Sequence, residues 1–161
     1  AQAALYHFYR IPKYQLQQKM FGVFQHTVRR HPSILLHGLD DTFNTPVSRH
    51  TENRVKDFAD FSHLKILIES EVSGLCLIQD VKRRHLHMFN HLEYDSDTLH
   101  NEYVRDLSAG QDVNIPLNYY PDNDPNKRPM NSWRGNGHLL FSNWVNFLYQ
   151  TTPFLLKDIG K

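Results

Sequence analysis

A histidine and a glutamate stand two residues apart in the stretch FNHLEYD, which spans Phe89 to Asp95. In extended backbone, residues two apart point to the same side, so His91 and Glu93 are predicted to face one cleft. A carboxylate beside an imidazole orients the ring and stabilises its charged form. The imidazole then takes a proton from a thiol or hydroxyl nucleophile. The two residues are therefore a candidate base with its orienting partner.

Two other interpretations fit the same stretch. His91 and Glu93 can be ordinary polar residues at a solvated strand end, because short motifs have many false positives. Alternatively, His85 and His87 can join them in a metal site, since a His-x-His pair on one strand binds zinc. The chain holds 11 histidines spread along its length, so such pairs arise by chance. We therefore expect no metal.

The nucleophile for such a base is missing from the obvious places. The single cysteine, Cys76, lies inside the apolar run LCLIQ. A buried free cysteine is usually an inert, small hydrophobic residue, whereas a nucleophilic cysteine favours a helix N-terminus. No serine stands in a G-x-S-x-G turn either. We expect Cys76 to be a core residue.

Strands and helices alternate around the candidate pair. An apolar face at helical spacing predicts a helix over residues 1–9. Apolar residues at helical spacing predict a second helix that carries Leu99 and Leu107, and a broad apolar stripe predicts a third over residues 137–149. Apolar alternation and β-branched content predict strands over 21–29, 64–68, 75–79 and 85–88, the last with His85 and His87 on one face and Leu86 and Met88 on the other. Glycine, proline and polar clusters predict loops over 38–49 and 118–129, and turns at 73–74 and 82–84.

The composition is that of one globular domain, and the mixture of predicted strands and helices indicates the α/β class. The chain has 161 residues, 40% of them hydrophobic and 22% charged, with a net charge of +1. This balance implies no nucleic-acid partner, and no apolar run has the length of a membrane span. A single cysteine fits a reducing compartment. The first helix has no capping residue at Ala1, so we expect the chain to be the C-terminal piece of a longer protein.

Six stretches cover nearly the whole chain: AQAALYHFYRIPKY, KMFGVFQHTV, DDTFNTPVSRH, HLEYDSDTLHNEYVRDLSAG, IPLNYYPDNDP and SWRGNGHLLFSNWVNFLYQTTP. They resemble the homoserine O-succinyltransferases, which are called O-acetyltransferases where they use acetyl-CoA. They keep the family's order and spacing. The resemblance implies that residues 1–161 are the C-terminal part of a single acyltransferase domain. It also implies a three-layer α/β/α, flavodoxin-like fold similar to the class I glutamine amidotransferases, with its N-terminal part missing from this chain.

The resemblance implies a reaction in methionine biosynthesis. A succinyl or acetyl group moves from acyl-CoA, a co-substrate, to the hydroxyl of L-homoserine through a cysteine thioester, with no metal or other cofactor. The nucleophilic cysteine is expected about three residues before Ala1, where the N-terminus of the following helix stabilises a thiolate. His91 matches the base and Glu93 the residue that orients it.

Three further positions match substrate-binding residues of the family. Arg105 is expected to pair with the homoserine carboxylate, because a guanidinium binds a carboxylate through two parallel hydrogen bonds. Lys19 and Ser48 match positions that line the amino-acid site. Read without the resemblance, all three are ordinary surface or turn residues. The resemblance further implies a cytoplasmic enzyme that is a homodimer at full length, without nucleic-acid or membrane partners.

Two alternatives and several departures from the family pattern stay open. The parent protein can be a glutaminase-type amidotransferase, or the chain can be an inactive truncated fragment. Asn90 and Leu92 replace the usual glycine and proline beside the base, which predicts a looser backbone there. His50 and the stretch Gly135-Asn136-Gly137-His138 also depart from the pattern, so donor and acceptor preference stay open.

Overall fold

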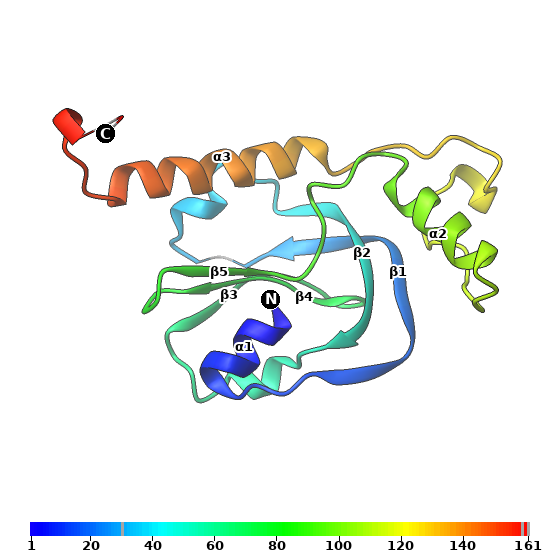
Figure 1. Cartoon of the computed structure of the whole chain (residues 1–161), viewed down its shortest axis with the longest axis horizontal. Coiled ribbons are helices and arrows are strands. Elements are labelled where there is room, and N and C mark those ends of the chain that lie inside the picture. The colour runs from blue at the N-terminus through cyan, green and yellow to red at the C-terminus, as the bar shows by residue number, and fades with distance from the viewer. Residues whose placement is uncertain (30, 159, 161) are drawn as a thin grey trace.

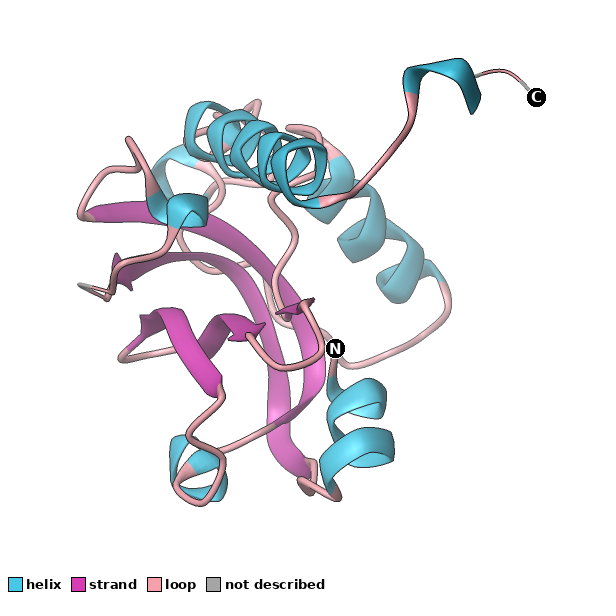
Figure 2. Ribbon diagram, turned by 90° about the vertical axis from the view of Figure 1, so that its left-hand side faces the viewer, coloured by secondary structure: helices cyan, strands magenta, loops and turns pink. Residues whose placement is uncertain are grey.

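The computed structural model describes residues 1–29, 31–158 and 160, and its main feature is a curled five-stranded sheet (Figures 1 and 2). The strands pair in the order β2-β1-β3-β4-β5, and every strand pair described is antiparallel. In Figure 1, α3 lies above the sheet and α1 below it. Within the described residues, no helix has both the length and the apolarity needed to cross a membrane. The elements are α1 (Gln2–Tyr9), β1 (Tyr14–Val28), β2 (Thr42–Glu52), β3 (Leu64–Ser70), β4 (Gly74–Asp80), β5 (His85–Met88), α2 (Thr98–Ser108) and α3 (Arg134–Thr151), with short 3-10 turns at Ile34–Leu36, Val55–Phe58, Pro121–Asn123 and Leu156–Asp158.

Two apolar clusters pack against the sheet, one shared with α2 and α3 and the other with α1. β4 contributes to both clusters. Its Cys76 and Leu77 belong to the first, and its Leu75 and Ile78 belong to the second, together with Leu5 of α1. A strand buried on both faces is a nearly continuous apolar run, which is why the sequence already indicated a buried strand here.

Most of the predicted elements are confirmed. Helices form at all three expected places, and strands form at all four, although β1 begins at Tyr14 and is therefore longer than predicted. The two faces of β5 differ as expected. The ring of His85 lies 5.3 Å from that of Phe8 on α1, whereas Leu86 and Met88 line an apolar groove with α3.

The loop predicted over residues 38–49 is wrong for most of its length. Residues 42–52 form β2, which pairs with β1 in register from Phe43 opposite His26 to Arg49 opposite Met20. Pro46 argued against a strand, because proline has no N–H to donate to a sheet. β2 is an edge strand, however, and edge strands tolerate proline.

An irregularity in β1 places Lys19 beside α2. Gln15 pairs with Thr51 and Met20 pairs with Arg49, so β1 has extra residues between two nearly adjacent pairs. Such bulges bend a strand and redirect its side chains, and they are common next to functional sites. Lys19 lies within this bulge, and its amine reaches α2.

Gly22 allows the segment that follows α2 to run alongside β1 at close range, in a parallel bridge with Leu117. Val23 donates its N–H to the carbonyl of Leu117 at 2.8 Å, and Leu117 donates to the carbonyl of Phe21 at 2.9 Å. A Cβ atom on Gly22 would lie 2.3 Å from the carbonyl oxygen of Leu117, and the φ angle of Gly22 is 146°. Only glycine fits this position.

Candidate active site

The structure brings His91 and Glu93 together just after β5. Nδ1 of His91 lies 2.7 Å from Oε1 of Glu93, and the side chains are 33% and 53% exposed. The backbone here turns, although the sequence argument assumed that it was extended, because Tyr94 donates its N–H to the carbonyl of His91 at 3.3 Å. The turn still leaves both side chains on one accessible side.

The bond to Glu93 decides which imidazole nitrogen is available for proton transfer. When Nδ1 of His91 donates to the carboxylate, Nε2 carries the lone pair and can accept a proton. The ring of Tyr94 stacks on the imidazole with centroids 4.2 Å apart and an interplanar angle of 12°. His91 is therefore oriented by a carboxylate at one ring nitrogen and by an aromatic face. This arrangement is suited to a general base.

Buried side chains restrain the backbone on either side of His91. Asn90 is 3% exposed, and its Nδ2 donates to Nε2 of His26 at 2.7 Å. Its Oδ1 accepts from Nη1 of Arg49 at 3.3 Å. The N–H of His91 donates to the carbonyl of Pro46 at 3.0 Å, so the segment is also tied to β2.

His26 is the centre of this buried polar network. It is fully buried, and its Nδ1 lies 2.9 Å from the carbonyl oxygen of Phe24, with the hydroxyl oxygens of Thr45 and Ser73 also within hydrogen-bonding distance of the ring. Burial lowers the pKa of His26 to about 4, so the ring is neutral near pH 7. With Nδ1 donating to the carbonyl, Nε2 is free to accept the amide N–H of Asn90.

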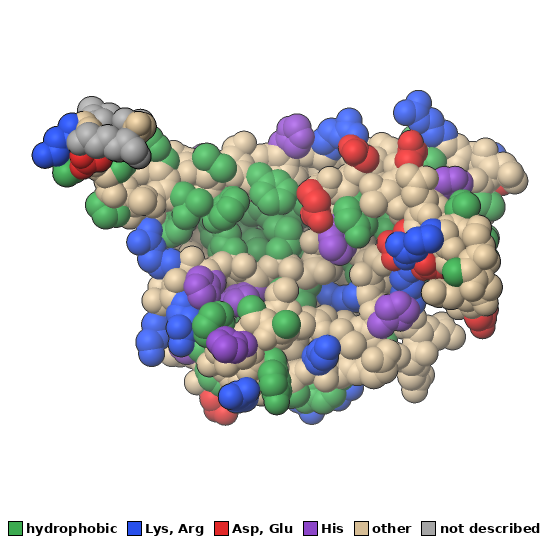
Figure 3. Space-filling model, viewed as in Figure 1, with side chains coloured by type: hydrophobic (Ala, Val, Ile, Leu, Met, Phe, Trp, Pro, Cys, Tyr) green, Lys and Arg blue, Asp and Glu red, His purple; other side chains and the backbone are tan. Residues whose placement is uncertain are grey.

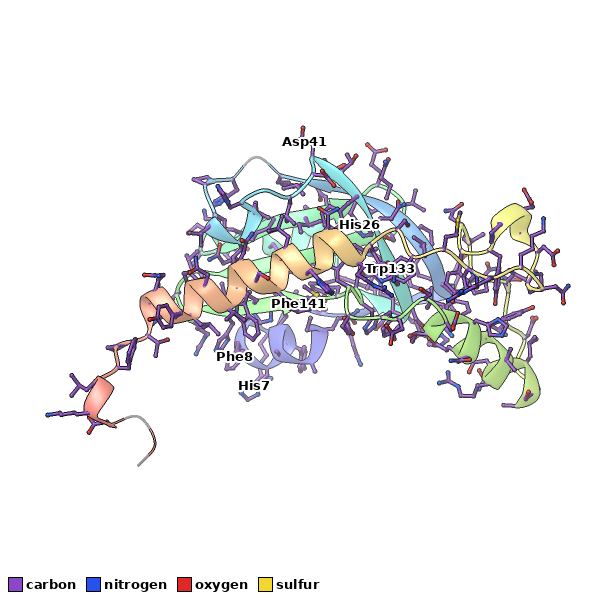
Figure 4. The ribbon with its side chains drawn as sticks, turned by 90° about the horizontal axis from the view of Figure 1, so that it is seen from above. His7, Phe8, His26, Asp41, Trp133 and Phe141 are labelled. Carbon is purple, nitrogen blue, oxygen red and sulfur yellow. The ribbon has the colours of Figure 1, made fainter. Side chains whose placement is uncertain are left out.

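The start of α3 packs directly against the other side of the segment. Nε1 of Trp133 donates to the carbonyl of Tyr94 at 2.8 Å, and Figure 4 shows Trp133 just before the first turn of the helix. Leu92 is 4% exposed, and a Cβ atom on Gly137 would lie 3.0 Å from its carbonyl oxygen. Gly137 therefore permits this close approach.

These contacts act against the loosening of the backbone that Asn90 and Leu92 are expected to cause around the base. The prediction considered only backbone freedom, which glycine raises and proline lowers. In the fold, the Asn90 amide is bonded on both sides and Leu92 is packed into the core. Side-chain contacts thus restrain the segment in place of a restricted backbone.

The three residues matched to substrate binding lie together at two carboxylates of α2. Nζ of Lys19 lies 2.8 Å from Oε1 of Glu102 and 2.8 Å from Oδ2 of Asp106. Ser48 donates its hydroxyl to Glu102 at 2.6 Å. Arg105 donates from Nε and Nη2 to Oδ1 of Asp106 at 2.8 and 2.6 Å. In Figure 3, acidic and basic side chains lie side by side over α2.

Electrostatics connects this cluster to the His91 segment through Tyr94. Burial raises the pKa of Tyr94, and the nearby carboxylates of Glu102 and Glu93 raise it further, while Arg105 opposes them. Hydrogen bonds from Lys19 and Arg105 lower the pKa of Asp106. Because Arg105 is 67% exposed, its guanidinium is accessible to a soluble anion.

Cys76 is a core residue, as predicted. Its side chain is fully buried in β4, and burial raises the pKa of its thiol to about 12. At neutral pH it is therefore a thiol that solvent does not reach, unsuited to nucleophilic attack.

The four residues of the metal interpretation separate into two groups. His91 pairs with Glu93, as described above. His85 and His87 lie instead beside Asp80, with one potential ligand atom from each of the three within 4.8 Å of the others.

Several residues that shape the site were not predicted from the sequence. Glu102 and Asp106 are four residues apart on α2, which places them on one helix face, and this spacing was an available signal. His26, Arg49 and Trp133 gave no comparable signal, because their partners lie on distant segments of the chain.

The chain is similar in sequence to a known protein family. The sequence model of the homoserine O-succinyltransferase family matches residues 1–154. A homoserine O-acetyltransferase from Rhizobium johnstonii is 50% identical over 160 residues, which are 99% of this chain and 52% of that protein. One from Hyphomonas neptunium is 50% identical over 161 residues, or 100% of this chain and 53% of its own length. The chain thus spans about half the length of the curated relatives it matches.

Solved structures share the fold at much lower sequence identity. A glutamine amidotransferase from Methylobacillus flagellatus aligns with a TM-score of 0.53 at 10% identity, over 84% of this chain and 55% of its own. A protein from Thermoplasma acidophilum described as a GMP synthase component aligns with a TM-score of 0.58 at 12% identity, over 93% of this chain and 54% of its own. The expected class I glutamine amidotransferase-like α/β fold is therefore confirmed.

Proposed function

The chain belongs to the homoserine O-succinyltransferase family, and we propose that the enzyme it forms part of transfers an acyl group from acyl-CoA to the hydroxyl of L-homoserine. The observation that carries the proposal is the 2.7 Å contact between His91 and Glu93. Acetyl is the favoured acyl group, because the two curated relatives described above are named O-acetyltransferases; succinyl is the alternative from the family's name.

In the first half of the proposed reaction, His91 activates a cysteine thiol supplied by the sequence before Ala1. Nε2 of His91 takes the thiol proton, and the thiolate attacks the thioester carbonyl of acyl-CoA. The CoA sulfur leaves with the bonding electrons and receives the proton from His91. Glu93 stabilises the imidazolium that exists between these two transfers.

In the second half, the same histidine activates the acceptor. Nε2 of His91 takes the proton of the homoserine hydroxyl, whose oxygen attacks the acyl-cysteine thioester. The cysteine sulfur leaves and regains a proton from the imidazolium, which restores the starting state. A single base thus serves both halves, and no metal or other cofactor is needed for either.

The proposed acceptor site is the cluster at α2. The exposed guanidinium of Arg105 binds the homoserine carboxylate, exchanging part of its pairing with Asp106 for the ligand. Lys19 holds Glu102 and Asp106 in place through its bonds to both carboxylates, and Ser48 holds Glu102 through its hydroxyl. The proposal also includes what the family resemblance implies: a role in methionine biosynthesis, a cytoplasmic location and a homodimeric full-length protein.

Kinetics of the full-length protein test the proposal. Wild-type protein should release CoA from acetyl-CoA or succinyl-CoA over many turnovers only when homoserine is present, with at most about one equivalent per active site in its absence, and it should form O-acylhomoserine. His91→Ala should lose turnover while keeping the circular dichroism spectrum of the wild type. Full turnover by a folded His91→Ala variant would exclude His91 as the base.

A parallel assay distinguishes a glutaminase. Release of ammonia from glutamine, without thiol release from acyl-CoA, would replace the acyl-transfer proposal with an amidotransferase. The 161-residue chain alone should have no acyltransferase activity, because Cys76 is buried and protonated. Turnover by this chain alone would require a different nucleophile.

A further inference from the structure

Three potential metal ligands meet between the β4–β5 hairpin and α1, on the opposite face of β5 from the apolar groove. Asp80 and His85 are directly opposite each other across the two strands, and His87 follows His85 on the same face. One potential ligand atom from each residue lies within 4.8 Å of the others. Figure 3 shows histidine side chains grouped on this part of the surface, where α1 and β5 lie.

The burial of the cluster indicates an interior site. Asp80 is fully buried and His87 is 4% exposed. Nε2 of His87 is buried without a hydrogen-bond partner in the part of the chain that the structure describes. An unpaired buried nitrogen costs about 1–3 kcal/mol, and a bound cation removes that cost. His85 is partly exposed, so an ion can reach the cluster from solvent.

The carboxylate is already oriented by its neighbours. Oδ1 of Asp80 accepts the N–H groups of Lys82 and Arg83 at 3.0 and 2.9 Å, and Oδ2 accepts the hydroxyl of Tyr9 on α1. Bonds of this kind around a ligating carboxylate fix its orientation in metal sites. A cation bound by Asp80 would therefore also be coupled to α1 through Tyr9.

The donor set and spacing favour zinc. Two imidazoles and one carboxylate form a common zinc ligand set, with a fourth position left for water. Tetrahedral bonds of about 2.1 Å place ligand atoms about 3.4 Å apart, so side-chain movements of about 1 Å suffice. The positive charges of Arg83 and Arg84 in the turn oppose the binding of a cation. Both guanidinium groups have other partners, however: that of Arg83 lies 4.5 Å from the ring centroid of Phe8, and that of Arg84 is bonded to Thr151 of α3.

We propose that Asp80, His85 and His87 bind one zinc ion, which crosslinks β4 and β5 next to α1. The site uses neither His91 nor Glu93, so it is independent of the proposed reaction. Its role is to stabilise the fold. Two residues of the rejected four-residue metal interpretation thus belong to a different site.

Titration with metal alone tests this site. The 161-residue chain should bind one equivalent of Co²⁺, with visible absorption typical of four-coordinate nitrogen and oxygen ligation. Zn²⁺ should displace it and raise the melting temperature by roughly 5–10 °C at a hundredfold excess over Kd. His85→Gln and His87→Gln should each weaken binding at least tenfold, and His138→Gln, at an exposed histidine on α3, should not.

Because His85 is partly exposed, its substitution should remove a metal ligand without unfolding the chain. His85→Gln should retain the wild-type fold without metal, whereas Asp80→Asn also replaces the oxygen that accepts the Tyr9 hydroxyl. A melting temperature that does not respond to Zn²⁺ would overturn the proposal. So would one-equivalent Co²⁺ binding of unchanged strength in both His85→Gln and His87→Gln.

Discussion

Asn90 donates a hydrogen bond from its side chain to the fully buried ring of His26, with a distance of 2.7 Å between Nδ2 and Nε2. Asn90 immediately precedes the candidate base, and His26 lies near the end of β1. The bond therefore ties the position of His91 to the interior of the sheet. In Figure 4, His26 lies in the body of the molecule behind the first turns of α3.

Removal of this bond should lower both stability and turnover. Asn90→Ala leaves Nε2 of His26 with weaker partners, and we expect a loss of about 1–3 kcal/mol in the free energy of unfolding. Urea unfolding of the chain measures the loss. In the full-length enzyme, kcat should fall more than KM changes, because the base is less well positioned. Asn146→Ala, at an exposed position on α3, is the matched control and should change neither; an unaltered stability of Asn90→Ala would show that the bond is unimportant.

The buried His26 should make stability depend on pH. Its pKa is about 4 in the folded protein and about 6.5 when exposed, so the unfolded chain binds more protons between these values. The stabilisation is complete above pH 6.5 and is lost as the pH falls to about 4, by about 3 kcal/mol. Unfolding of wild type and His26→Gln across this range tests the effect. The variant should show a shallower pH dependence, and parallel curves would contradict the assignment to His26.

Glu93 should contribute to turnover through charge as well as orientation. Glu93→Gln preserves the size of the side chain and a hydrogen-bonding group but removes the charge that stabilises imidazolium. Because Glu93 is 53% exposed, solvent screens part of this effect, and we expect kcat to fall by less than the roughly 10⁴-fold loss that follows replacement of a buried orienting carboxylate. Steady-state kinetics of the full-length enzyme measure it. Glu71→Gln, in the exposed β3–β4 turn, should behave as wild type.

Lys19 and Arg105 should separate stability from substrate binding. Lys19→Met removes the ammonium that bonds to both the buried carboxylate of Asp106 and the partly buried carboxylate of Glu102, and we expect a loss of about 2–4 kcal/mol in unfolding free energy. Arg105→Ala, at a side chain 67% exposed, should cost less than about 1 kcal/mol but raise the KM for homoserine at least tenfold. Equal effects of both changes on stability would contradict this division of roles.

Cys76 should be unreactive until the chain unfolds. Its thiol is fully buried, with a pKa of about 12, so a thiol reagent at about pH 8 should label it only at the rate of opening or unfolding. Labelling in buffer and in denaturant gives the comparison. Cys76→Ala should destabilise the fold modestly and leave acyl transfer by the full-length enzyme intact. Rapid labelling of the native chain would show that the thiol is accessible.

The sequence by itself determined the local elements and the family. Apolar spacing was sufficient for the three helices and for the buried strand β4, because burial of those faces is set by residues near in sequence. The pairing of His91 with Glu93 was also accessible, since they stand two positions apart and a single turn brings their side chains together.

Only the tertiary structure decided what surrounds these residues. Residues around Pro46 were predicted to form a loop but form an edge strand, because whether a strand tolerates proline depends on which of its sides has a partner strand. From the sequence, Asn90 is expected to loosen the backbone beside the base, and its hydrogen bond to His26, 64 residues away, forms only because the fold brings β1 next to this segment. Contacts between distant segments depend on how the strands pair and curl, and local propensity carries no information about that pairing.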